Sequence, residues 1–287
     1  MKKAAITGGT GFIGQHIVRK LESLGYEVVF IGRSDIIGET SILKEKLKGA
    51  SLVINLAGSP IVKKWTEENK KSIYHSRIYT TTNLVYALDT QSTELFISAS
   101  AIGIYSDDQD QTENNCTFSD DYLAYICSNW EKEALQCSSN IRTVIFRFGV
   151  VLGNGGVLQK IIPLFKLGLG SIIGNGRQAY SWVQIRDVIG AISFVIENKE
   201  CKGVYNLTAP HPVSYKIFAQ TLAAKLKRKV WMYVPGFVIK MMYGEGALVL
   251  LKGQRVFPER LLEEGYKFQF PEIASALENI LHQNSDS

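Results

Sequence analysis

The chain has 287 residues, of which 46% are hydrophobic and 21% charged, a composition that excludes a disordered or fibrous chain and a disulfide-stapled miniprotein. Its 32 basic and 27 acidic side chains leave a net charge of +5 with no block of five or more basic residues. No nucleic-acid partner is therefore expected.

The cysteines and the apolar runs indicate the compartment. Four cysteines lie far apart, without the spacing of metal ligands, and are expected to be reduced and structural: Cys116, Cys127, Cys137 and Cys201. The chain shows neither a signal peptide nor a run of eighteen apolar residues. We therefore expect a cytoplasmic protein with no metal and no membrane partner.

Short apolar runs of β type alternate with segments of helical periodicity along the first half of the chain. This alternation predicts an α/β fold, a Rossmann-type doubly wound parallel sheet with helices on both faces. Helices are expected from Phe12 to Gly25, from Glu67 to Leu88 and over about Asp121–Cys137. The predicted strands are Ala4–Thr7, Val28–Ile31, Leu52–Leu56, Leu95–Ser98 and Thr143–Phe148.

Beyond Phe148 the sequence becomes rich in glycine, with loops at 153–156 and 174–176 that could line a cleft around a helix at Val157–Leu167. A last sheet strand is expected at Val204–Leu207 and a separate one at Val230–Val234. We expect an NAD(P)-binding Rossmann domain over residues 1–210, with a cleft-lining insert at about 151–185, and a small, mainly helical substrate lobe over residues 211–287.

The strongest chemical signal is a glycine-rich turn directly after the first strand. Gly9, Gly11 and Gly14 satisfy the pattern G-x-G-x-x-G between a strand and a helix. Such glycines allow a tight turn, a close approach of the backbone to a pyrophosphate and close packing of helix on strand. An isolated match would fit an ordinary turn, but this context predicts dinucleotide contacts from Gly8, Gly9, Thr10, Gly11, Phe12, Ile13 and Gly14.

The residues after the second strand favour NADP over NAD. A carboxylate at this position usually binds the adenosine ribose of NAD, whereas the chain has Arg33 followed by Ser34. Asp35 lies two residues beyond Arg33 and keeps NAD open as the less favoured cofactor.

Several further motifs give the chain a family resemblance over nearly its whole length. It resembles an atypical extended short-chain dehydrogenase/reductase of the "epimerase family protein" branch, in which a nucleotide-sugar-epimerase-like domain precedes a helical C-terminal module. The motifs are Thr7–Gly14, Asn55–Gly58, Trp65–Thr66, Ser76–Arg77, Ser100–Tyr105, Arg147–Gly153, Trp182–Val188 and Gln254–Pro258.

The resemblance implies further cofactor contacts. It places Leu56, Ala57 and Gly58 near the adenosine side, Arg77 toward the cofactor and Val150 near the nicotinamide. It also implies that Asp187 holds loops together rather than reacting.

One departure from the family pattern leaves the catalytic residues unassigned. Related dehydrogenases use a Tyr-x-x-x-Lys pair, in which the lysine lowers the pKa of the tyrosine. None of the 13 tyrosines has a lysine four residues later, and the register set by Glu131 puts Leu123 and Cys127 at the two positions. Ser100 is a weak candidate for a substrate-orienting hydroxyl, and Cys127 fits a buried small side chain better than a nucleophile.

Three functions fit this pattern. The first is an NADP-dependent oxidoreductase or epimerase-like enzyme acting on an unidentified small molecule. The second is a non-catalytic NADP-binding regulatory or interaction protein, and the third is a sugar-nucleotide isomerising enzyme with permanently bound NAD. The sequence assigns neither the substrate nor the oligomeric state.

Overall fold

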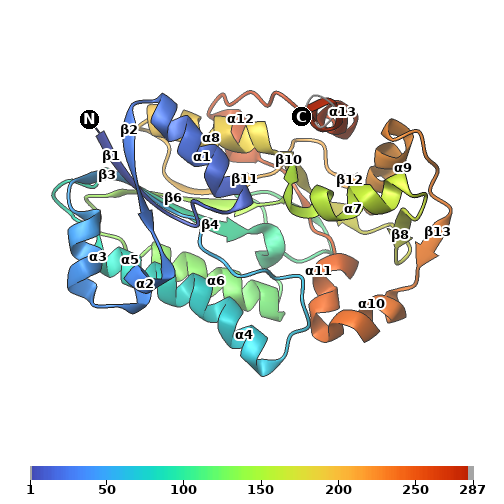
Figure 1. Cartoon of the computed structure of the whole chain (residues 1–287), viewed down its shortest axis with the longest axis horizontal. Coiled ribbons are helices and arrows are strands. Elements are labelled where there is room, and N and C mark those ends of the chain that lie inside the picture. The colour runs from blue at the N-terminus through green and yellow to red at the C-terminus, as the bar shows by residue number, and fades with distance from the viewer. Residues whose placement is uncertain (1, 284–287) are drawn as a thin grey trace.

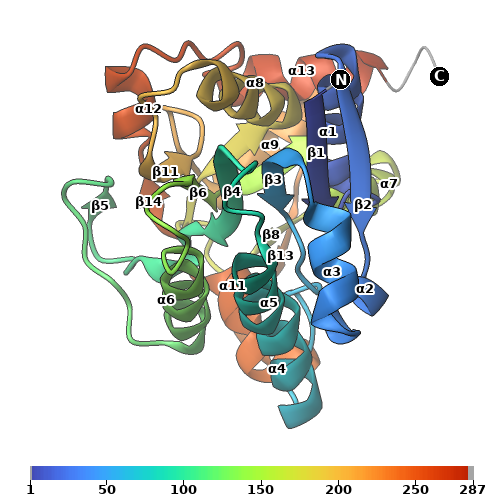
Figure 2. The same cartoon turned by 90° about the vertical axis from the view of Figure 1, so that its left-hand side faces the viewer.

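The computed structural model describes residues 2–283 and is built around a six-stranded parallel sheet with helices on both faces (Figures 1 and 2). The strands run in the order β11-β6-β4-β3-β1-β2, and every adjacent pair is parallel. Their bounds are β1 Lys2–Thr7, β2 Tyr26–Ile31, β3 Ala50–Asn55, β4 Leu95–Ala101, β6 Arg142–Phe148 and β11 Gly203–Leu207. The predicted fold class and all six predicted sheet strands are confirmed.

The strand order creates a switch point between β1 and β3. The chain leaves β1 for β2 on one side and then returns to β3 on the other side of β1. In open α/β sheets of this kind, ligands bind in the crevice beyond the carboxyl ends of the strands at the switch point. The glycine turn follows β1 and Leu56 follows β3, so both lie at this edge.

Two layers of helices cover the sheet. One face is packed by α1 (Phe12–Ser23) and α8 (Ile185–Glu197), whose buried side chains include Ile17, Leu21 and Val188. The other face is packed by α3 (Thr40–Leu47), α5 (Thr80–Ala87) and α6 (Tyr122–Ala134). Burying each large aliphatic side chain contributes about 1.5–3 kcal/mol, which fixes the helices on the sheet.

The predicted helices are present. Gly25 follows α1 with a φ of +80°, the left-handed conformation expected of a glycine after a helix end. The helix expected from Glu67 is one continuous run formed by α4 (Glu67–Tyr74), a π-helical turn η1 (His75–Tyr79) and α5. Asp121 accepts hydrogen bonds from two backbone N–H groups in the first turn of α6 and so begins that helix.

A second lobe joins the glycine-rich insert to the C-terminal part of the chain. Strand β8 (Ser171–Ile173) pairs with β13 (Met232–Val234), and β9 (Ala179–Tyr180) pairs with β12 (Val213–Ser214). The helices of this lobe are α7 (Gly156–Lys166), α9 (Tyr215–Lys225), α10 (Gly236–Tyr243), α11 (Leu248–Leu251) and α13 (Ile273–Gln283). Trp182 and Phe218 are fully buried between the insert and these helices.

Shorter elements complete the chain: α2 (Arg33–Ile37), η2 (Ile102–Ile104), β5 (Asp110–Gln111), β7 (Val150–Gly153), β10 (Trp182–Gln184), η3 (Gly244–Ala247), β14 (Arg255–Val256) and α12 (Glu259–Glu263). A domain boundary near residue 210 stays a prediction, and residues 284–287 of the expected lobe lie outside the described residues. None of the described helices is both long and apolar enough to cross a membrane. Within residues 2–283 no group of three or more His, Cys, Asp or Glu side chains could hold a metal ion.

Candidate cofactor site

The turn after β1 depends on glycine at two positions. Gly8 has a φ of +67°, and its carbonyl oxygen accepts a hydrogen bond from the Gly11 N–H at 3.0 Å. A Cβ added to Gly14 would lie 2.1 Å from that same carbonyl oxygen and 2.7 Å from the Cα of Gly9. The turn can therefore close against α1 only without side chains at these positions.

The N-terminus of α1 is suited to an anion. The first N–H groups of a helix have no partner within it and carry partial positive charge. Gly11 is the N-cap and offers no side chain to them, and the first turn contains no acidic residue. The amides that follow Thr10, including those of Phe12 and Ile13, are thus a suitable cradle for a phosphate group.

The glycine-rich insert packs against the aromatic ring that follows this turn. A Cβ on Gly153 or Gly155 would approach the Phe12 ring to 2.8 Å or 2.4 Å, respectively. The insert therefore reaches the phosphate turn because its residues there have no side chains. This contact brings the start of the second lobe to the crevice at the end of β1.

Two side chains after β2, Asp35 and Arg33, could bind the adenosine ribose or its phosphate, and their surroundings differ. Asp35 accepts a hydrogen bond from the Gly32 N–H at 2.7 Å and forms an ion pair with Lys46 Nζ, also at 2.7 Å. Only 11% of its side chain is exposed. Burial opposes ionisation of Asp35, but the Lys46 and Gly32 contacts hold the pKa of its carboxyl below the usual value. Arg33 and Ser34 are exposed at the start of α2. The carboxylate is already occupied, whereas the guanidinium is accessible.

A buried polar network fixes the ends of β1 and β3 beside each other. The Thr7 hydroxyl donates to Asn55 Oδ1 at 2.7 Å, and Asn55 Nδ2 donates to the Thr81 hydroxyl at 2.7 Å. The backbone N–H groups of Leu56 and Ala57 in turn donate to Thr7 Oγ1 at 3.1 and 3.2 Å. Asn55 lies within a motif quoted above, yet its role as the centre of this network was not predicted from the sequence.

Arg77 lies on the π-helical turn η1, a type of helix irregularity that is frequent at functional sites. Its Nη2 donates to the Ser59 carbonyl at 3.1 Å, and its guanidinium lies 5.3 Å from the centre of the Trp130 ring. A Cβ on Gly58 would lie 3.1 Å from the same nitrogen. Burial lowers the pKa of Arg77, whose guanidinium nonetheless stays protonated at any ordinary pH.

The residue expected near the nicotinamide, Val150, has less specific surroundings. Val150 begins β7 and is half-buried, and its N–H donates to the Ser181 carbonyl at 2.9 Å. Trp65, from another of the family motifs, is buried, and its indole N–H donates to the Ile61 carbonyl at 3.0 Å. A Cβ on Gly246 would lie 2.0 Å from the Lys63 carbonyl oxygen, so the C-terminal module packs directly on this loop.

The two positions that normally hold the tyrosine and lysine contain no acid–base group. Leu123 packs near the backbone of Gly103, with 3.4 Å between its Cβ and a Cβ added to that glycine. Cys127 is 4% exposed, and burial raises the pKa of its thiol to about 12. At neutral pH this thiol is protonated, and it is therefore neither a base nor an activated nucleophile.

This burial predicts slow chemical modification of Cys127. We expect iodoacetamide to alkylate Cys127 in the native protein at least ~100-fold more slowly than the half-buried Cys116, because only the accessible thiolate reacts. Mass spectrometry of the peptides at successive times measures both rates. Comparable rates in the native protein would contradict the placement of Cys127 in the core.

Ser100 is part of a buried network rather than free at the cleft. Its hydroxyl donates to Glu131 Oε1 at 2.6 Å, and Glu131 accepts two hydrogen bonds from Arg147 at 2.7 and 2.6 Å. Arg147 also donates to the Tyr105 hydroxyl, which donates to Asn206 Oδ1 at 2.7 Å. Ser100 is thus committed to holding β4, α6 and β6 together.

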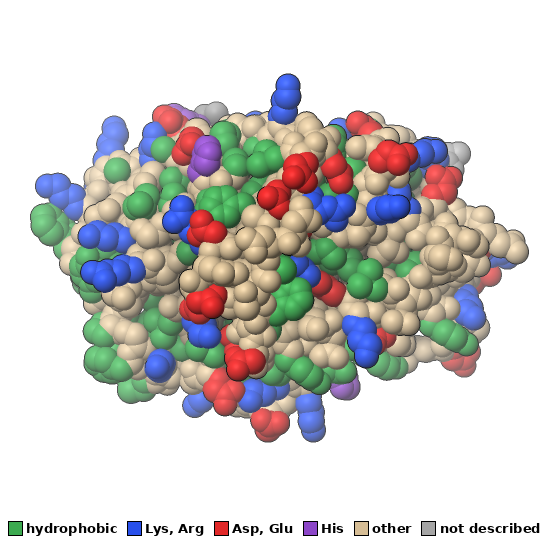
Figure 3. Space-filling model, turned by 180° about the vertical axis from the view of Figure 1, so that it is seen from behind, with side chains coloured by type: hydrophobic (Ala, Val, Ile, Leu, Met, Phe, Trp, Pro, Cys, Tyr) green, Lys and Arg blue, Asp and Glu red, His purple; other side chains and the backbone are tan. Residues whose placement is uncertain are grey.

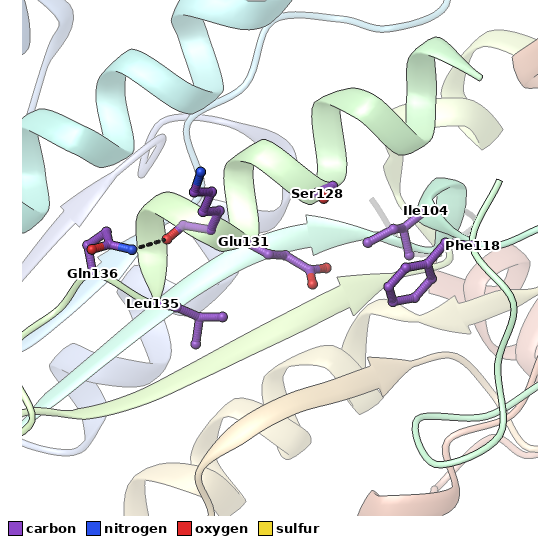
Figure 4. Close-up of a pocket in the computed structure, with 7 residues that line it drawn as sticks. Ile104, Phe118, Ser128, Glu131, Leu135 and Gln136 are labelled. Carbon is purple, nitrogen blue, oxygen red and sulfur yellow. Dashed lines mark hydrogen bonds between the residues drawn. The ribbon is translucent and has the colours of Figure 1, made fainter. Parts of the chain in front are cut away.

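The carboxylate of Glu131 projects from α6 toward Ile104 and Phe118, beside a shallow surface pocket (Figure 4). The pocket has a volume of about 400 Å³ and is lined by Ile104, Phe118, Ser128, Glu131, Lys132, Leu135 and Gln136. None of these residues belongs to the expected cofactor contacts. The pocket thus shares no residue with the candidate cofactor site.

Asp187 is fully buried at the start of α8 and accepts hydrogen bonds from the backbone N–H groups of Gln269 and Phe270 at 2.7 and 3.0 Å. The Tyr266 hydroxyl donates to the Asp187 carbonyl at 2.9 Å. Asp187 thus ties the C-terminal loop to α8, as the loop-holding role implied.

Comparisons with known proteins agree with this architecture. Residues 4–208 match the NAD dependent epimerase/dehydratase family, and residues 234–280 match a domain of unknown function, DUF1731. The chain is 36% identical to the epimerase family protein SDR39U1 homolog, chloroplastic, of Arabidopsis thaliana, over 96% of this chain and 86% of that protein. It is 35% identical to the epimerase family protein YfhF of Bacillus subtilis, over 96% and 97%.

A solved structure gives the same result in three dimensions. The crystal structure of human epimerase family protein SDR39U1 (isoform 2) with NADPH superposes with a TM-score of 0.90 at 32% identity, covering 98% of this chain and 99% of that one. The chain therefore belongs to the NAD dependent epimerase/dehydratase family, as an atypical short-chain dehydrogenase/reductase with a C-terminal module.

Proposed function

We propose that this protein binds NADP(H) and transfers a hydride between the nicotinamide and a small molecule. The observation that carries the cofactor choice is the arrangement after β2, where Lys46 and the Gly32 N–H occupy Asp35 and Arg33 is left exposed. A guanidinium suits the 2′-phosphate of NADP, whereas NAD needs a free carboxylate for its ribose. The NADPH in the human relative supports the same choice.

The other contacts follow the order of the cofactor's parts. The turn Gly8–Gly14 would hold the pyrophosphate on the amides of α1, and Leu56–Gly58 would pass along the adenosine side. Arg77 would point toward the cofactor from beside Gly58, and Val150 would lie at the nicotinamide end. The nicotinamide, when bound, supplies the hydride, while the chain binds and orients both reactants.

The protein supplies no tyrosine–lysine pair for the proton. Leu123 is apolar and the Cys127 thiol is held protonated, so these positions can exclude water and shape the pocket but cannot exchange a proton near neutral pH. We propose that the proton comes from water or from the substrate itself. The cytoplasmic location expected from the sequence stays a prediction.

Isotope transfer tests the proposed activity. NADPH deuterated at C4 is incubated with the protein and a panel of carbonyl compounds and sugar nucleotides, and mass spectrometry follows the label. Deuterium in a product supports hydride transfer. Tight NADPH binding with no label transfer to any member of the panel, and no exchange with deuterated solvent, would contradict the activity and leave a binding role.

Arg33→Ala tests the assignment of the 2′-phosphate. We expect NADPH binding to weaken by about 1–3 kcal/mol, the range for a lost charge-assisted hydrogen bond, with little change in NADH binding. Calorimetric titration measures both affinities. Arg19→Ala, an exposed arginine on α1, is the matched control, and equal losses for the two cofactors in Arg33→Ala would show that Arg33 does not read the phosphate.

A further inference from the structure

The second lobe carries a concentration of exposed apolar side chains. Trp231 is 75% exposed, Met241 74%, Leu167 74% and Phe237 71%. We call the whole set the lobe face, which comprises the exposed side chains of residues 164–169 and 227–242. Its large apolar members are Leu164, Leu167, Leu169, Trp231, Met232, Tyr233, Phe237, Met241 and Met242.

These two segments form one surface. Strand β8, which follows α7 after a short loop, pairs with β13. In addition, Arg228 Nε donates to the Lys166 carbonyl at 2.9 Å. Pro235 joins β13 immediately to α10. In Figure 1, β13 lies at one end of the long axis of the molecule and α10 lies below it, in the same half.

The charge of the chain is also concentrated here. Residues 156–184 and 215–244 contain nine Lys and Arg and no Asp or Glu, while the remaining residues hold 23 basic and 27 acidic side chains. These two segments thus have a charge of +9, against −4 for the remaining residues. Figure 3 shows hydrophobic and basic side chains at this end, at its left, with acidic ones at its upper margin and toward the middle of the molecule.

Basic and aromatic groups adjoin on the lobe face. Lys229 Nζ lies 5.4 Å from the centre of the Trp231 ring, and both residues border a depression of about 320 Å³ together with Arg228 and Val230. A cationic rim around exposed tryptophan, tyrosine and methionine is the composition of an interfacial membrane-binding surface. Arginine and lysine at such a depression can bind a phosphate headgroup.

We propose that the lobe face binds anionic phospholipid bilayers peripherally, with the apolar side chains entering the interface and the basic ones contacting headgroups. The expectation of no membrane partner rested on the lack of a long apolar segment, which a peripheral surface does not need. Charge complementarity favours a lipid surface over a second copy of the chain. Residues 156–184 and 215–244 contain no acidic side chain. Two copies that docked through the lobe face would therefore bring two positively charged surfaces together, and these surfaces would repel each other.

Flotation of the full-length protein with vesicles tests the proposal. We expect binding to phosphatidylcholine vesicles that contain 30% phosphatidylglycerol, loss of that binding at 0.5 M salt, and no binding to pure phosphatidylcholine. Lys229→Glu with Lys240→Glu, and separately Trp231→Ser with Phe237→Ser, should each reduce the bound fraction at least tenfold. All four side chains are exposed, so the variants should keep the thermal unfolding temperature of the wild type.

Matched variants elsewhere on the surface serve as controls. Lys132→Glu with Lys199→Glu makes the same change in net charge, and Tyr86→Ser with Leu135→Ser removes the same kind of exposed side chain. Both pairs should bind vesicles like the wild type. No binding to anionic vesicles at low salt, or equal losses in lobe and control variants, would overturn the proposal. A dimer seen by light scattering and broken only by the lobe variants would instead assign the face to a second copy.

Discussion

Replacing Gly14 by alanine should weaken NADPH binding by at least ~100-fold, about 2.7 kcal/mol. The added Cβ would lie 2.1 Å from the Gly8 carbonyl oxygen, an approach that only a backbone shift can relieve. That shift would move the turn and the first amides of α1 away from the pyrophosphate. Calorimetric titration with NADPH at a temperature where the variant is folded measures the loss.

Gly236→Ala is the matched control, because a Cβ at Gly236 meets the Leu251 side chain at an ordinary 3.5 Å. It should bind NADPH like the wild type. Overpacking at Gly14 should also cost about 1–3 kcal/mol of unfolding free energy, which urea denaturation reports separately. A Gly14→Ala protein that keeps wild-type affinity for NADPH would show that the turn does not hold the pyrophosphate.

Removing Arg147 should give the largest loss of stability. Arg147→Met leaves the Glu131 carboxylate buried without its cation and leaves the Tyr105 hydroxyl without a donor. Breaking a buried ion pair on one side costs about 3–5 kcal/mol. Urea denaturation should therefore show this decrease in unfolding free energy.

The double variant Glu131→Met/Arg147→Met should recover most of the loss, because neither charge then remains buried alone. Lys225→Met, which breaks a partly exposed ion pair with Glu278, should change stability by less than about 1 kcal/mol. An Arg147→Met protein within 1 kcal/mol of the wild type would mean that water or relaxation satisfies Glu131 and that the network contributes little.

The sheet could be predicted from the sequence because its strands are short apolar runs buried on both faces. β1 and β3 each have four consecutive buried residues, bounded by turn residues that mark the strand ends. Amphipathic helices such as α1 were equally clear. In contrast, α8 was not predicted, although its buried residues Val188, Ile192 and Val195 recur at helical spacing and pack against the sheet.

The remaining features depend on contacts between residues far apart in the chain. The small strands of the second lobe pair insert segments with C-terminal segments, as Ile172 does with Tyr233. Asp35 forms an ion pair with Lys46, eleven residues away. Ser100 donates its hydrogen bond to Glu131 on a different element. Local periodicity and motifs contain no information on these partners.

The position of the candidate cofactor site at the edge of the sheet follows from the order of the motifs. The glycine turn and Leu56–Gly58 lie together at the switch point between β1 and β3, as the motif order implied, while the Asn55 network that fixes them appeared only in three dimensions. The individual contacts to a bound cofactor stay predictions.

Titration calorimetry of the unmodified protein with NADPH and with NADH tests the central claim most directly. An exposed Arg33 beside an occupied Asp35 predicts a one-to-one complex with NADPH that is at least about tenfold tighter than that with NADH. No heat with either cofactor, or tighter binding of NADH, would contradict it.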